Sequence, residues 1–437
     1  MLKSKIETLL RNHVKESLSP KQEDISFVST IYNSFTDILG QNECRQIGSF
    51  PRYTAIRPLH DLDIIYKLNN EEFEGDNPQD FLNELAKLFE ENYTNPTSYS
   101  IKTKIQTHSL AFIFLKGEDE VFAVDIVPAK IRGKNEFDDD TFLVPEIIQF
   151  RSHRKKEDFY AKLQSTNQNM KWIKSDPLGY ITIASNINKE NSDFRKSVKF
   201  IKGWKNACKD KNENFKLKSF HLEQLITEQL KIKSNQTIFD SLFECFTDLK
   251  DNVRKPKIKD RADSDKYIDQ YVLELNESEL SLIDQAVDAV LIAFEKFHGN
   301  VNNLINVGYY KRFSKEMFLF DSKIPVLVNT DLEFEIEGYV KRVSGYREYT
   351  AKVSSLRGDA LNNNSIKFDI IKNNIGNDSR KWKIRNDDNS PEPRGEIGYE
   401  TEPVRIETTK YYGKHYAECY AIKNGICVAK SKSDVII

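Results

Sequence analysis

Three aspartates in this chain are spaced so that folding would gather their carboxylates. Asp61 and Asp63 stand two apart in an apolar run, and on a β-strand such residues project to the same face. Asp125 interrupts the apolar stretch from Val121 to Pro128, and a buried carboxylate costs on the order of several kcal/mol unless it is paired or binds a metal. We therefore expect the three aspartates to meet in one site.

Such a trio is a suitable ligand set for a hard divalent cation. Mg²⁺, which Mn²⁺ can replace, prefers oxygen ligands and completes its shell with waters and triphosphate oxygens. Three carboxylates around two metal ions would activate an attacking hydroxyl and stabilise a leaving pyrophosphate. The alternatives are a solvated strand end for Asp61 and Asp63 and a salt bridge to an arginine for Asp125. We predict phosphoryl transfer, with Asp61, Asp63 and Asp125 as metal ligands and catalytic residues.

A turn just before these aspartates offers groups that bind phosphates. Gly48 and Ser49 would present backbone N–H groups and a hydroxyl, while Arg52 and Arg57 would neutralise phosphate charge. The histidines show no paired spacing that would favour a Ser-His-Asp triad. The motif therefore predicts a triphosphate site beside the metal ligands.

The elements that must position these groups follow from the hydrophobic periodicity. Helical spacing predicts one helix before Ser19-Pro20 and a second from Ile25 to Leu39 that ends at Gly40. The next part of the chain has the pattern of a mixed α/β block, with strands over residues 62–65, 109–115 and 121–127 and a helix over residues 81–93.

Beyond residue 150 the pattern changes twice. Residues 151–325 are dominated by helical spacing, and the charged segment Lys250–Lys266 predicts a mobile surface loop among those helices. Residues 334–437 have short alternating apolar runs divided by turns, which predicts a separate small β-rich domain. We predict a catalytic region over residues 1–325, with an α/β lobe over about residues 1–150 and a helical lobe after it.

The composition is that of a folded chain without a global field for nucleic acid. Of 437 residues 39% are hydrophobic, and 65 Lys and Arg against 67 Asp and Glu leave a net charge of -2. We expect no membrane contact, because no apolar span reaches membrane length. Five scattered cysteines without zinc spacing indicate reduced thiols and a cytoplasmic location.

The motifs resemble a known superfamily. The segments GSF, TAIRP, DLD and VDIVPA are similar to the polymerase-β-like nucleotidyltransferase core, and specifically to the bacterial cyclic-oligonucleotide synthases (CD-NTases), relatives of animal cyclic GMP–AMP synthase and oligoadenylate synthetase. The resemblance extends to Trp172–Pro177, Phe200–Trp204 and Leu217–Glu223. It implies an α/β (α+β) core with a helical lobe. The zinc insertion of the animal DNA sensor is missing and there is no basic excess, so no DNA activator is expected.

The resemblance also implies roles in nucleotide binding. In that family a lysine-bearing helix and a Ser-aromatic pair contact the triphosphate and stack on a base, roles that fall on Lys202, Ser219 and Phe220. A point cation, a hydroxyl and a flat ring suit a nucleotide, while a core aromatic is the alternative for Phe220. Tyr53 stands where the family usually has Gly, so we expect the local turn and the aim of Arg52 to differ.

The C-terminal residues resemble the sensor domain found on some of these synthases and on adenylyl/guanylyl cyclases. The segments that carry this resemblance are Lys381–Asn386, Pro393–Ile397, Tyr412–Tyr420 and Cys427–Ala429. It implies that a nucleotide or other small ligand binds this domain. Trp382, Arg385, Arg394 and His415 are the candidate residues, with packing or turn capping as the alternative.

Three functions are compatible with these residues. The resemblance implies an enzyme that makes a cyclic di- or trinucleotide from ATP, GTP or pyrimidine triphosphates, releases pyrophosphate, and activates a downstream effector in antiphage (CBASS-type) signalling. The same metal site would serve a linear nucleotidyltransferase acting on an RNA end or a protein. A catalytically idle nucleotide-sensing protein is the third, against which the three intact aspartates argue.

Overall fold

The structure is a computed structural model in which the chain divides into two compact units. It describes residues 3–68, 77–106, 108–147, 170–313, 315–344, 346–360, 362, 364–376, 379–398 and 404–437. One unit comprises Leu10–Cys245 and Lys250–Leu280, and the other comprises Met1–Leu9, Phe246–Leu249 and Ser281–Ile437. The domain boundaries predicted at residues 150, 325 and 334 stay predictions.

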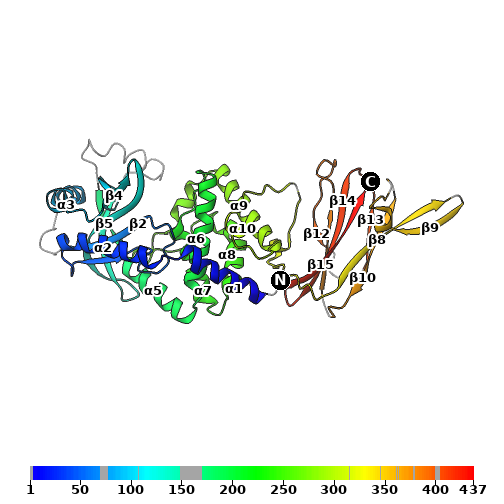
Figure 1. Cartoon of the computed structure of the whole chain (residues 1–437), viewed down its shortest axis with the longest axis horizontal. Coiled ribbons are helices and arrows are strands. Elements are labelled where there is room, and N and C mark those ends of the chain that lie inside the picture. Colours follow the sequence, from blue (N-terminus) through cyan, green and yellow to red (C-terminus); the bar gives the residue numbers. More distant parts are fainter. Residues whose placement is uncertain are drawn as a thin grey trace. The chain divides into compact units, whose positions relative to one another are not determined.

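The elements carry the labels used in Figure 1. The described helices are α1 (Lys3–His13), the π-helix η1 (Val14–Leu18), α2 (Gln22–Leu39), α3 (Pro78–Asn92), α5 (Pro177–Glu190), α6 (Phe194–Lys211), α7 (Ser219–Ile232), α8 (Ile238–Asn252), η3 (Gln270–Glu274), α9 (Glu277–Glu295), α10 (Asn302–Ile305), η4 (Leu319–Ser322) and η5 (Ser354–Leu356). The described strands are β1 (Cys44–Ile47), β2 (Asp61–Lys67), β3 (Ser100–Ile105), β4 (Leu110–Lys116), β5 (Asp119–Lys134), β6 (Asp140–Ile147), β7 (Met170–Ser175), β8 (Phe334–Ser344), β9 (Arg347–Lys352), β10 (Ser365–Asn373), β11 (Ser379–Arg385), β12 (Ile397–Gly398), β13 (Val404–Thr408), β14 (Lys414–Lys423) and β15 (Ile426–Ile436). The fold is mixed α+β, as predicted.

The first unit is built on one mixed sheet. Its strand order is β1-β2-β5-β4-β3, and β6 continues from β5 and pairs in turn with β7. The strands β4 and β5, both predicted, form an antiparallel hairpin, whereas β2 and β5 run parallel. The long strand β5 therefore pairs both with β2, which carries Asp61, and with β6 of the β6–β7 ribbon.

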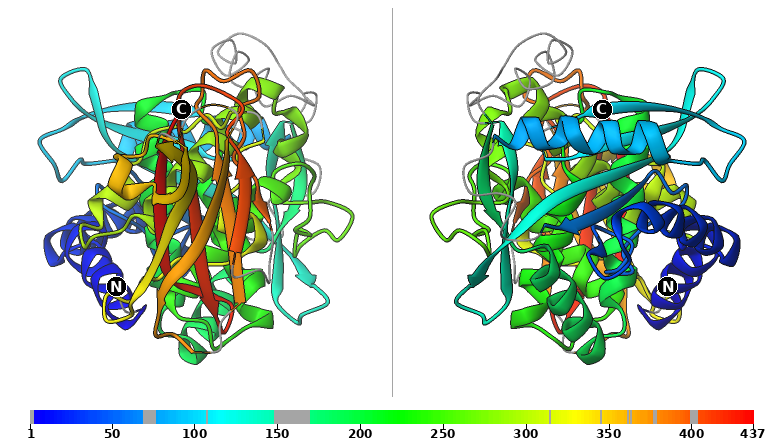
Figure 2. Two further views of the ribbon diagram at one scale, coloured as in Figure 1. Left: turned by 90° about the vertical axis from the view of Figure 1, so that its right-hand side faces the viewer. Right: turned by 90° about the vertical axis from the view of Figure 1, so that its left-hand side faces the viewer.

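The two faces of this sheet have different partners. Leu62 and Ile64 of β2 and Val124 and Ile126 of β5 are fully buried in a core shared with α2 and α3, the helix that crosses the strands in the right view of Figure 2. Side chains alternate along a strand, so Asp61, Asp63 and Asp125 belong to the opposite face. The apolar pattern that builds the core thus also turns the acidic groups away from it.

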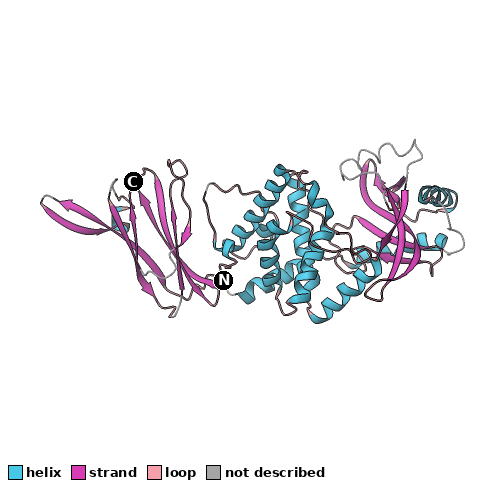
Figure 3. Cartoon of the chain, turned by 180° about the vertical axis from the view of Figure 1, so that it is seen from behind, coloured by secondary structure: helices cyan, strands magenta, loops and turns pink. Residues whose placement is uncertain are grey.

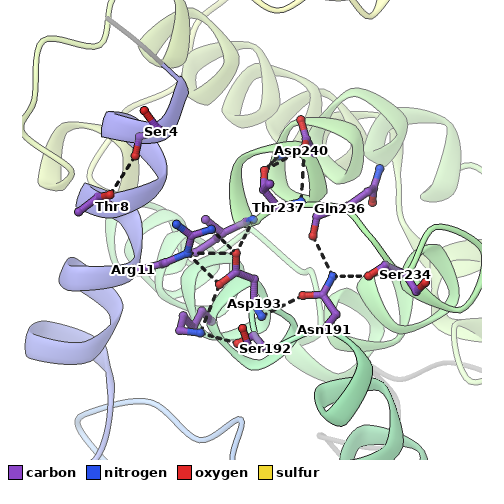
Figure 4. A network of polar contacts seen from close by, with 12 residues as sticks. Ser4, Thr8, Arg11, Asn191, Ser192, Asp193, Ser234, Gln236, Thr237 and Asp240 are labelled. Atoms are coloured by element: carbon purple, nitrogen blue, oxygen red, sulfur yellow. Dashed lines mark hydrogen bonds and ion pairs between the residues drawn. The ribbon is translucent and has the colours of Figure 1, made fainter.

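The helical half of this unit is centred on α6. Trp204 of α6 is fully buried, and its ring meets Phe215 edge-on at 5.6 Å between ring centroids. At the start of α6, Asp193 accepts hydrogen bonds from Arg11 Nε at 2.9 Å and from the backbone N–H of Ile238 at 3.1 Å (Figure 4). This shared carboxylate fastens α6 to the end of α1 and the start of α8.

The segment Lys250–Lys266 is packed more closely than the sequence predicts. Its first residues complete α8, and Ile258 and Ala262 are both buried. The side chain of Arg261 is only 9% exposed. The prediction of a mobile surface loop is wrong for this part, because periodicity reports regular elements and misses single residues that anchor a loop.

The C-terminal residues of the second unit form two four-stranded antiparallel sheets, drawn as magenta arrows in Figure 3. Their strand orders are β13-β10-β8-β9 and β12-β11-β14-β15, and the buried side chains of Val340, Phe368, Trp382 and Cys419 share the core between them. The predicted β-rich structure of the C-terminal residues is confirmed. All five cysteines are buried and unbonded. Across the residues that can be described, no helix is long and apolar enough to cross a membrane.

Candidate active site

Strand register brings the three predicted carboxylates together. In the parallel pairing of β2 with β5, Asp63 lies opposite Asp125 and Asp61 lies opposite Ala123. Paired residues of neighbouring strands project to the same face, so all three carboxylates do so. Ser109 Oγ donates to Asp125 Oδ1 at 3.0 Å, and within the described ranges Asp125 forms no ion pair with an arginine. The salt-bridge alternative for Asp125 is therefore not observed.

Burial and the neighbouring acidic groups raise the pKa values of two of these carboxyl groups. Burial, then the charges of Asp61 and Asp125, raise the pKa of Asp63, and Arg52 opposes them. Burial also raises the pKa of Asp125 to about 6, although the hydrogen bond from Ser109 lowers it. Like charges close together at partial burial favour either protonation or a bound cation.

The donor set suits a divalent ion that takes further ligands from its substrate. In the part of the chain that the structure describes, no three His, Cys, Asp or Glu side chains are arranged to enclose a metal ion by themselves. Mg²⁺ is usually bound through one or two carboxylates, waters and substrate phosphates rather than by an all-protein cage. Asp61, Asp63 and Asp125 fit that mode, because they supply hard oxygens and uncompensated charge.

Gly48 makes room for one of these carboxylates. It follows β1, whose last residue Ile47 pairs with Asp63, and it has a φ of +76°. A Cβ atom on Gly48 would lie 1.8 Å from Asp63 Oδ2. The turn continues through Ser49, whose carbonyl accepts from the backbone N–H of Thr54 at 3.0 Å. Only glycine allows the predicted phosphate-binding turn to pass this close to Asp63.

Tyr53 adopts the left-handed backbone conformation that glycine favours, with a φ of 60°. For a residue with a Cβ this costs about 1–2 kcal/mol. The Arg195 guanidinium lies 4.5 Å from the centroid of the Tyr53 ring, and Arg195 Nε donates to the Arg52 carbonyl at 3.1 Å. A cation–π contact at an exposed site contributes roughly 0.5–1 kcal/mol, which offsets part of that cost. The backbone at Tyr53 is therefore left-handed although the residue is not glycine.

Arg52 and Lys202 both point at Glu223. Arg52 Nε donates to Glu223 Oε1 at 2.6 Å, and Lys202 Nζ donates to Glu223 Oε2 at 2.5 Å. Lys202 Nζ also reaches the carbonyl and the hydroxyl of Thr54 at 3.1 Å each. Both cations tie the turn to α6 and α7 through one carboxylate.

This buried cluster is a charged one. Burial alone would raise the pKa of Glu223, but Lys202 and Arg52 lower it to about 2. Burial also lowers the pKa of Lys202, and Glu223 opposes that shift. We take all three groups as charged, because one carboxylate with two cations and a hydroxyl donor from Thr54 has its oxygens satisfied. The cluster holds the turn in place next to the aspartates.

Ser219 and Phe220 open α7, about one helical turn before Glu223. Ser219 is the first residue of the helix, where backbone N–H groups lack intrahelical partners. The Phe220 ring is partly exposed, lies 5.2 Å from the Arg52 guanidinium and meets the Tyr180 ring edge-on at 5.0 Å. A fully buried core position, the alternative for Phe220, is not observed.

A cleft of about 1100 Å³ continues from the carboxylate face of the sheet. Its floor includes Ile65 and Val127, which follow Asp63 and Asp125 by two residues on the same strands. Its other lining residues include both cations, such as Lys171 and Lys266, and the acids Glu146, Asp260 and Asp263. The volume lies slightly above the ~300–1,000 Å³ of ligand pockets, so the cleft has room for a nucleotide.

The four C-terminal candidate residues do not share one site. Trp382 is fully buried in the core between the sheets, and the Arg385 guanidinium stacks 3.5 Å from the centroid of Phe313. Arg394 and His415 both line a cavity of about 170 Å³. There Arg394 pairs with Glu407 at 3.2 Å, and His415 Nδ1 accepts from the backbone N–H of Asp387 at 3.3 Å. Trp382 and Arg385 therefore have structural roles.

Several residues of this site escaped the sequence analysis. Glu223 stood inside a quoted motif without a role, and Ser109, Tyr180 and Arg261 carried no signal at all. Their contributions depend on distances across the fold, to which periodicity and local motif spacing give no access. Only the apolar neighbours of Glu223, Leu222 and Ile226, hinted at burial.

Comparison with known families identifies the C-terminal part. Residues 309–437 match the model of the adenylyl/guanylyl and SMODS C-terminal sensor domain. The chain carries this sensor domain. The predicted resemblance is confirmed for the sensor domain, which contains the cavity at Arg394 and His415. A search of curated proteins found no significant match.

Several solved structures of bacterial proteins match part of this chain. They include the CdnC of E. coli MS115-1 with ATP (17% identity, 68% of this chain and 94% of that chain, TM-score 0.49). They also include the DncV cyclic AMP-GMP synthase of Vibrio cholerae (13%, 69% and 83%, 0.40) and the CdnE cyclic dinucleotide synthase of Elizabethkingia meningoseptica with GTP and Apcpp (13%, 57% and 84%, 0.40).

Proposed function

We propose that the protein is a nucleotidyltransferase that joins nucleoside triphosphates into a cyclic di- or trinucleotide and releases pyrophosphate. The observation that carries this proposal is the convergence of Asp61, Asp63 and Asp125 on one face of the sheet. The cleft next to them, lined by apolar side chains and by charged groups of both signs, has room for the substrates. ATP, GTP and pyrimidine triphosphates are the substrates we propose.

Asp61, Asp63 and Asp125 would hold Mg²⁺ or Mn²⁺. When bound, these ions supply positive charge beside the attacking hydroxyl and the leaving pyrophosphate. Asp125 is the residue that we assign to accept the proton of the ribose hydroxyl, because it lies opposite Asp63 on the central strand and keeps a fixed orientation through Ser109. The carboxylates thus combine charge and proton acceptance in one place.

The remaining residues bind and orient the nucleotides. The turn at Gly48 and Ser49 and the helix start at Ser219 offer N–H groups and hydroxyls to phosphate oxygens. Phe220 offers a partly exposed ring on which a base stacks. Lys202 and Arg52 act indirectly, since their contacts with Glu223 hold the turn that carries Ser49.

The sensor domain and the cellular role extend this proposal. We propose that a nucleotide or other small ligand binds the sensor domain, and the cavity lined by Arg394 and His415 supports this. The product would activate a downstream effector in antiphage (CBASS-type) signalling. Five buried, unbonded thiols are compatible with action in the cytoplasm.

The product distinguishes this proposal from its rivals. The protein is incubated with Mg²⁺ and the four nucleoside triphosphates, treated with phosphatase, and the products are weighed by mass spectrometry. A phosphatase-resistant mass equal to two or three nucleoside monophosphates minus the waters of ring closure supports cyclisation. Phosphatase-sensitive products identify a linear transferase, and the absence of any product from wild-type protein contradicts enzymatic activity.

A further inference from the structure

A series of cations and rings runs through the first unit from the phosphate-binding turn. The Arg52 guanidinium lies 5.2 Å from the Phe220 centroid, and Phe220 meets Tyr180 at 5.0 Å. The Arg261 guanidinium lies 5.8 Å from the Tyr180 centroid and 4.2 Å from that of Phe137. Phe220, whose ring is expected to stack on a base, is thus linked through Tyr180 to Arg261 of the Lys250–Lys266 segment.

Arg261 is fixed by two carboxylates. Its Nε donates to Asp176 Oδ2 at 2.9 Å, and a terminal nitrogen forms an ion pair with Asp139. Asp176 is 1% exposed and caps α5, where its Oδ1 accepts from the backbone N–H of Gly179 at 2.8 Å. Tyr180 directly follows this cap, so Arg261 sets the start of the helix that carries the Tyr180 ring.

The β5–β6 turn supplies the other side of this arrangement. Asn135 Oδ1 accepts from the backbone N–H groups of Phe137 and Asp139, each at 3.0 Å. Asn135 Nδ2 donates to Asp176 Oδ2 at 2.8 Å. The turn is therefore closed on itself and tied to the same carboxylate that holds Arg261. Phe137 and Asp139 meet the guanidinium with little freedom to move.

We propose that Arg261 is a positioning residue for the base of the bound nucleotide, a role that rests on the proposed function. It fixes Tyr180 against Phe220, so that the Phe220 ring is presented in one orientation. An arginine is needed because one planar group must pair with Asp176 and Asp139 while stacking between Phe137 and Tyr180. A lysine would keep the charge but lose the stacking plane and the second ion pair.

The test separates base binding from phosphate binding. Wild-type protein, Arg261→Gln and Arg261→Lys are titrated with ATP, GTP and inorganic tripolyphosphate, which has no base. Base–aromatic stacking is strong enough that its loss weakens nucleotide binding about 5- to 100-fold. We expect both variants to lose affinity for the nucleotides and to keep the wild-type affinity for tripolyphosphate. Lys255→Ala, an exposed position in the same segment, is the matched control and should behave as wild type.

A double-mutant cycle shows whether Arg261 acts through Phe220. In a Phe220→Ala background, Arg261→Lys should have no further effect on nucleotide affinity, because the ring that it positions is gone. Equal losses for nucleotides and tripolyphosphate, or additive losses in the double variant, would overturn the inference and leave Arg261 as a structural anchor only. Product formation by the wild type is scored separately, so failure of the proposed function and failure of this inference are distinct results.

Discussion

Asp63 lies opposite Asp125 in the parallel pairing of β2 with β5, so two carboxylates distant in the sequence share one face of the sheet. The same register places Leu62 beside Val124 on the other face, in the core with α2 and α3. The alternation of side chains along β2 and β5 therefore places apolar residues in the core on one face and the carboxylates together on the other. Packing of the core residues offsets the repulsion between the carboxylates, and these carboxylates are the metal ligands in our proposal.

Asp63→Asn should stabilise the metal-free protein and remove its response to magnesium. Removing one charge from three neighbouring carboxylates relieves repulsion and desolvation, which should raise the free energy of unfolding by about 1 kcal/mol or more. Thermal unfolding with a chelator and with Mg²⁺ measures both effects. Asp119→Asn, at the exposed first residue of β5, should keep the wild-type response. A lower midpoint for Asp63→Asn without metal would contradict the electrostatic account.

Gly48→Ala should reduce activity by more than the strain of a left-handed backbone conformation alone would cause. The new Cβ atom would lie 1.8 Å from Asp63 Oδ2, so the carboxylate or the turn must shift. A displacement of about 1 Å at a reacting centre costs on the order of 10²-fold in rate. Gly117→Ala is the matched control, because Gly117 has a φ of +68° and nothing within 4 Å of the added atom. Equal activities of the two variants would exclude a role for this close approach.

Glu223→Gln should be strongly destabilising at neutral pH. It leaves Arg52 and Lys202 buried without their shared carboxylate, and breaking a buried pair costs about 3–5 kcal/mol. Chemical denaturation at pH 7 measures this loss. Glu228→Gln on the same helix, whose partner Lys231 is at the surface, should change stability by less than about 0.5 kcal/mol.

The same variant has a predicted pH dependence. Lys202 and Arg52 hold the pKa of Glu223 at about 2, below its ordinary value of 4.5, after overcoming the opposing effect of burial. A lowered carboxyl pKa contributes stability above pH 4.5 that is lost as the pH falls towards 2. The difference between wild type and Glu223→Gln should therefore shrink across that interval. A difference that stays constant down to pH 2 would contradict the ionic cluster.

Glu295 of α9 predicts the opposite pH dependence in the second unit. Burial raises its pKa to about 7, against the charges of Lys430 and Lys383, and its Oε1 finds no hydrogen-bond partner among the described residues. The folded state then holds the proton more tightly than the unfolded chain, so stability present below pH 4.5 is lost as the pH rises through 7. Glu295→Gln should remove this loss. Thermal midpoints from pH 5 to 8 measure it, and parallel curves for both proteins would exclude it.

The sequence was sufficient for the elements that depend on local pattern. The alternation around Asp61 and Asp125 predicted β2 and β5, and the glycine after Leu39 predicted the end of α2. Both follow from side-chain periodicity and backbone freedom, which are properties of neighbouring residues. The grouping of the aspartates was predicted from strand alternation for Asp61 and Asp63, and from the free-energy cost of burying a lone carboxylate for Asp125.

Contacts between distant segments could not be predicted in this way. Lys202 was expected to contact phosphate, but the structure directs it to Glu223 and Thr54. The choice between a phosphate and a carboxylate partner depends on where α7 lies relative to α6, and no local pattern contains that information. The contacts of Arg261 could not be predicted for the same reason, because the charges of its segment predicted a solvent-exposed loop.

Pyrophosphate release by Asp125→Asn tests the central claim most directly. Asparagine keeps the size of Asp125 and the contact with Ser109 but removes the charge and the proton acceptor. The account predicts magnesium-dependent release by wild type and by Asp119→Asn, and a loss of about 10²–10⁴-fold for Asp125→Asn, the range of general acid–base catalysis. Equal release by all three proteins would contradict it.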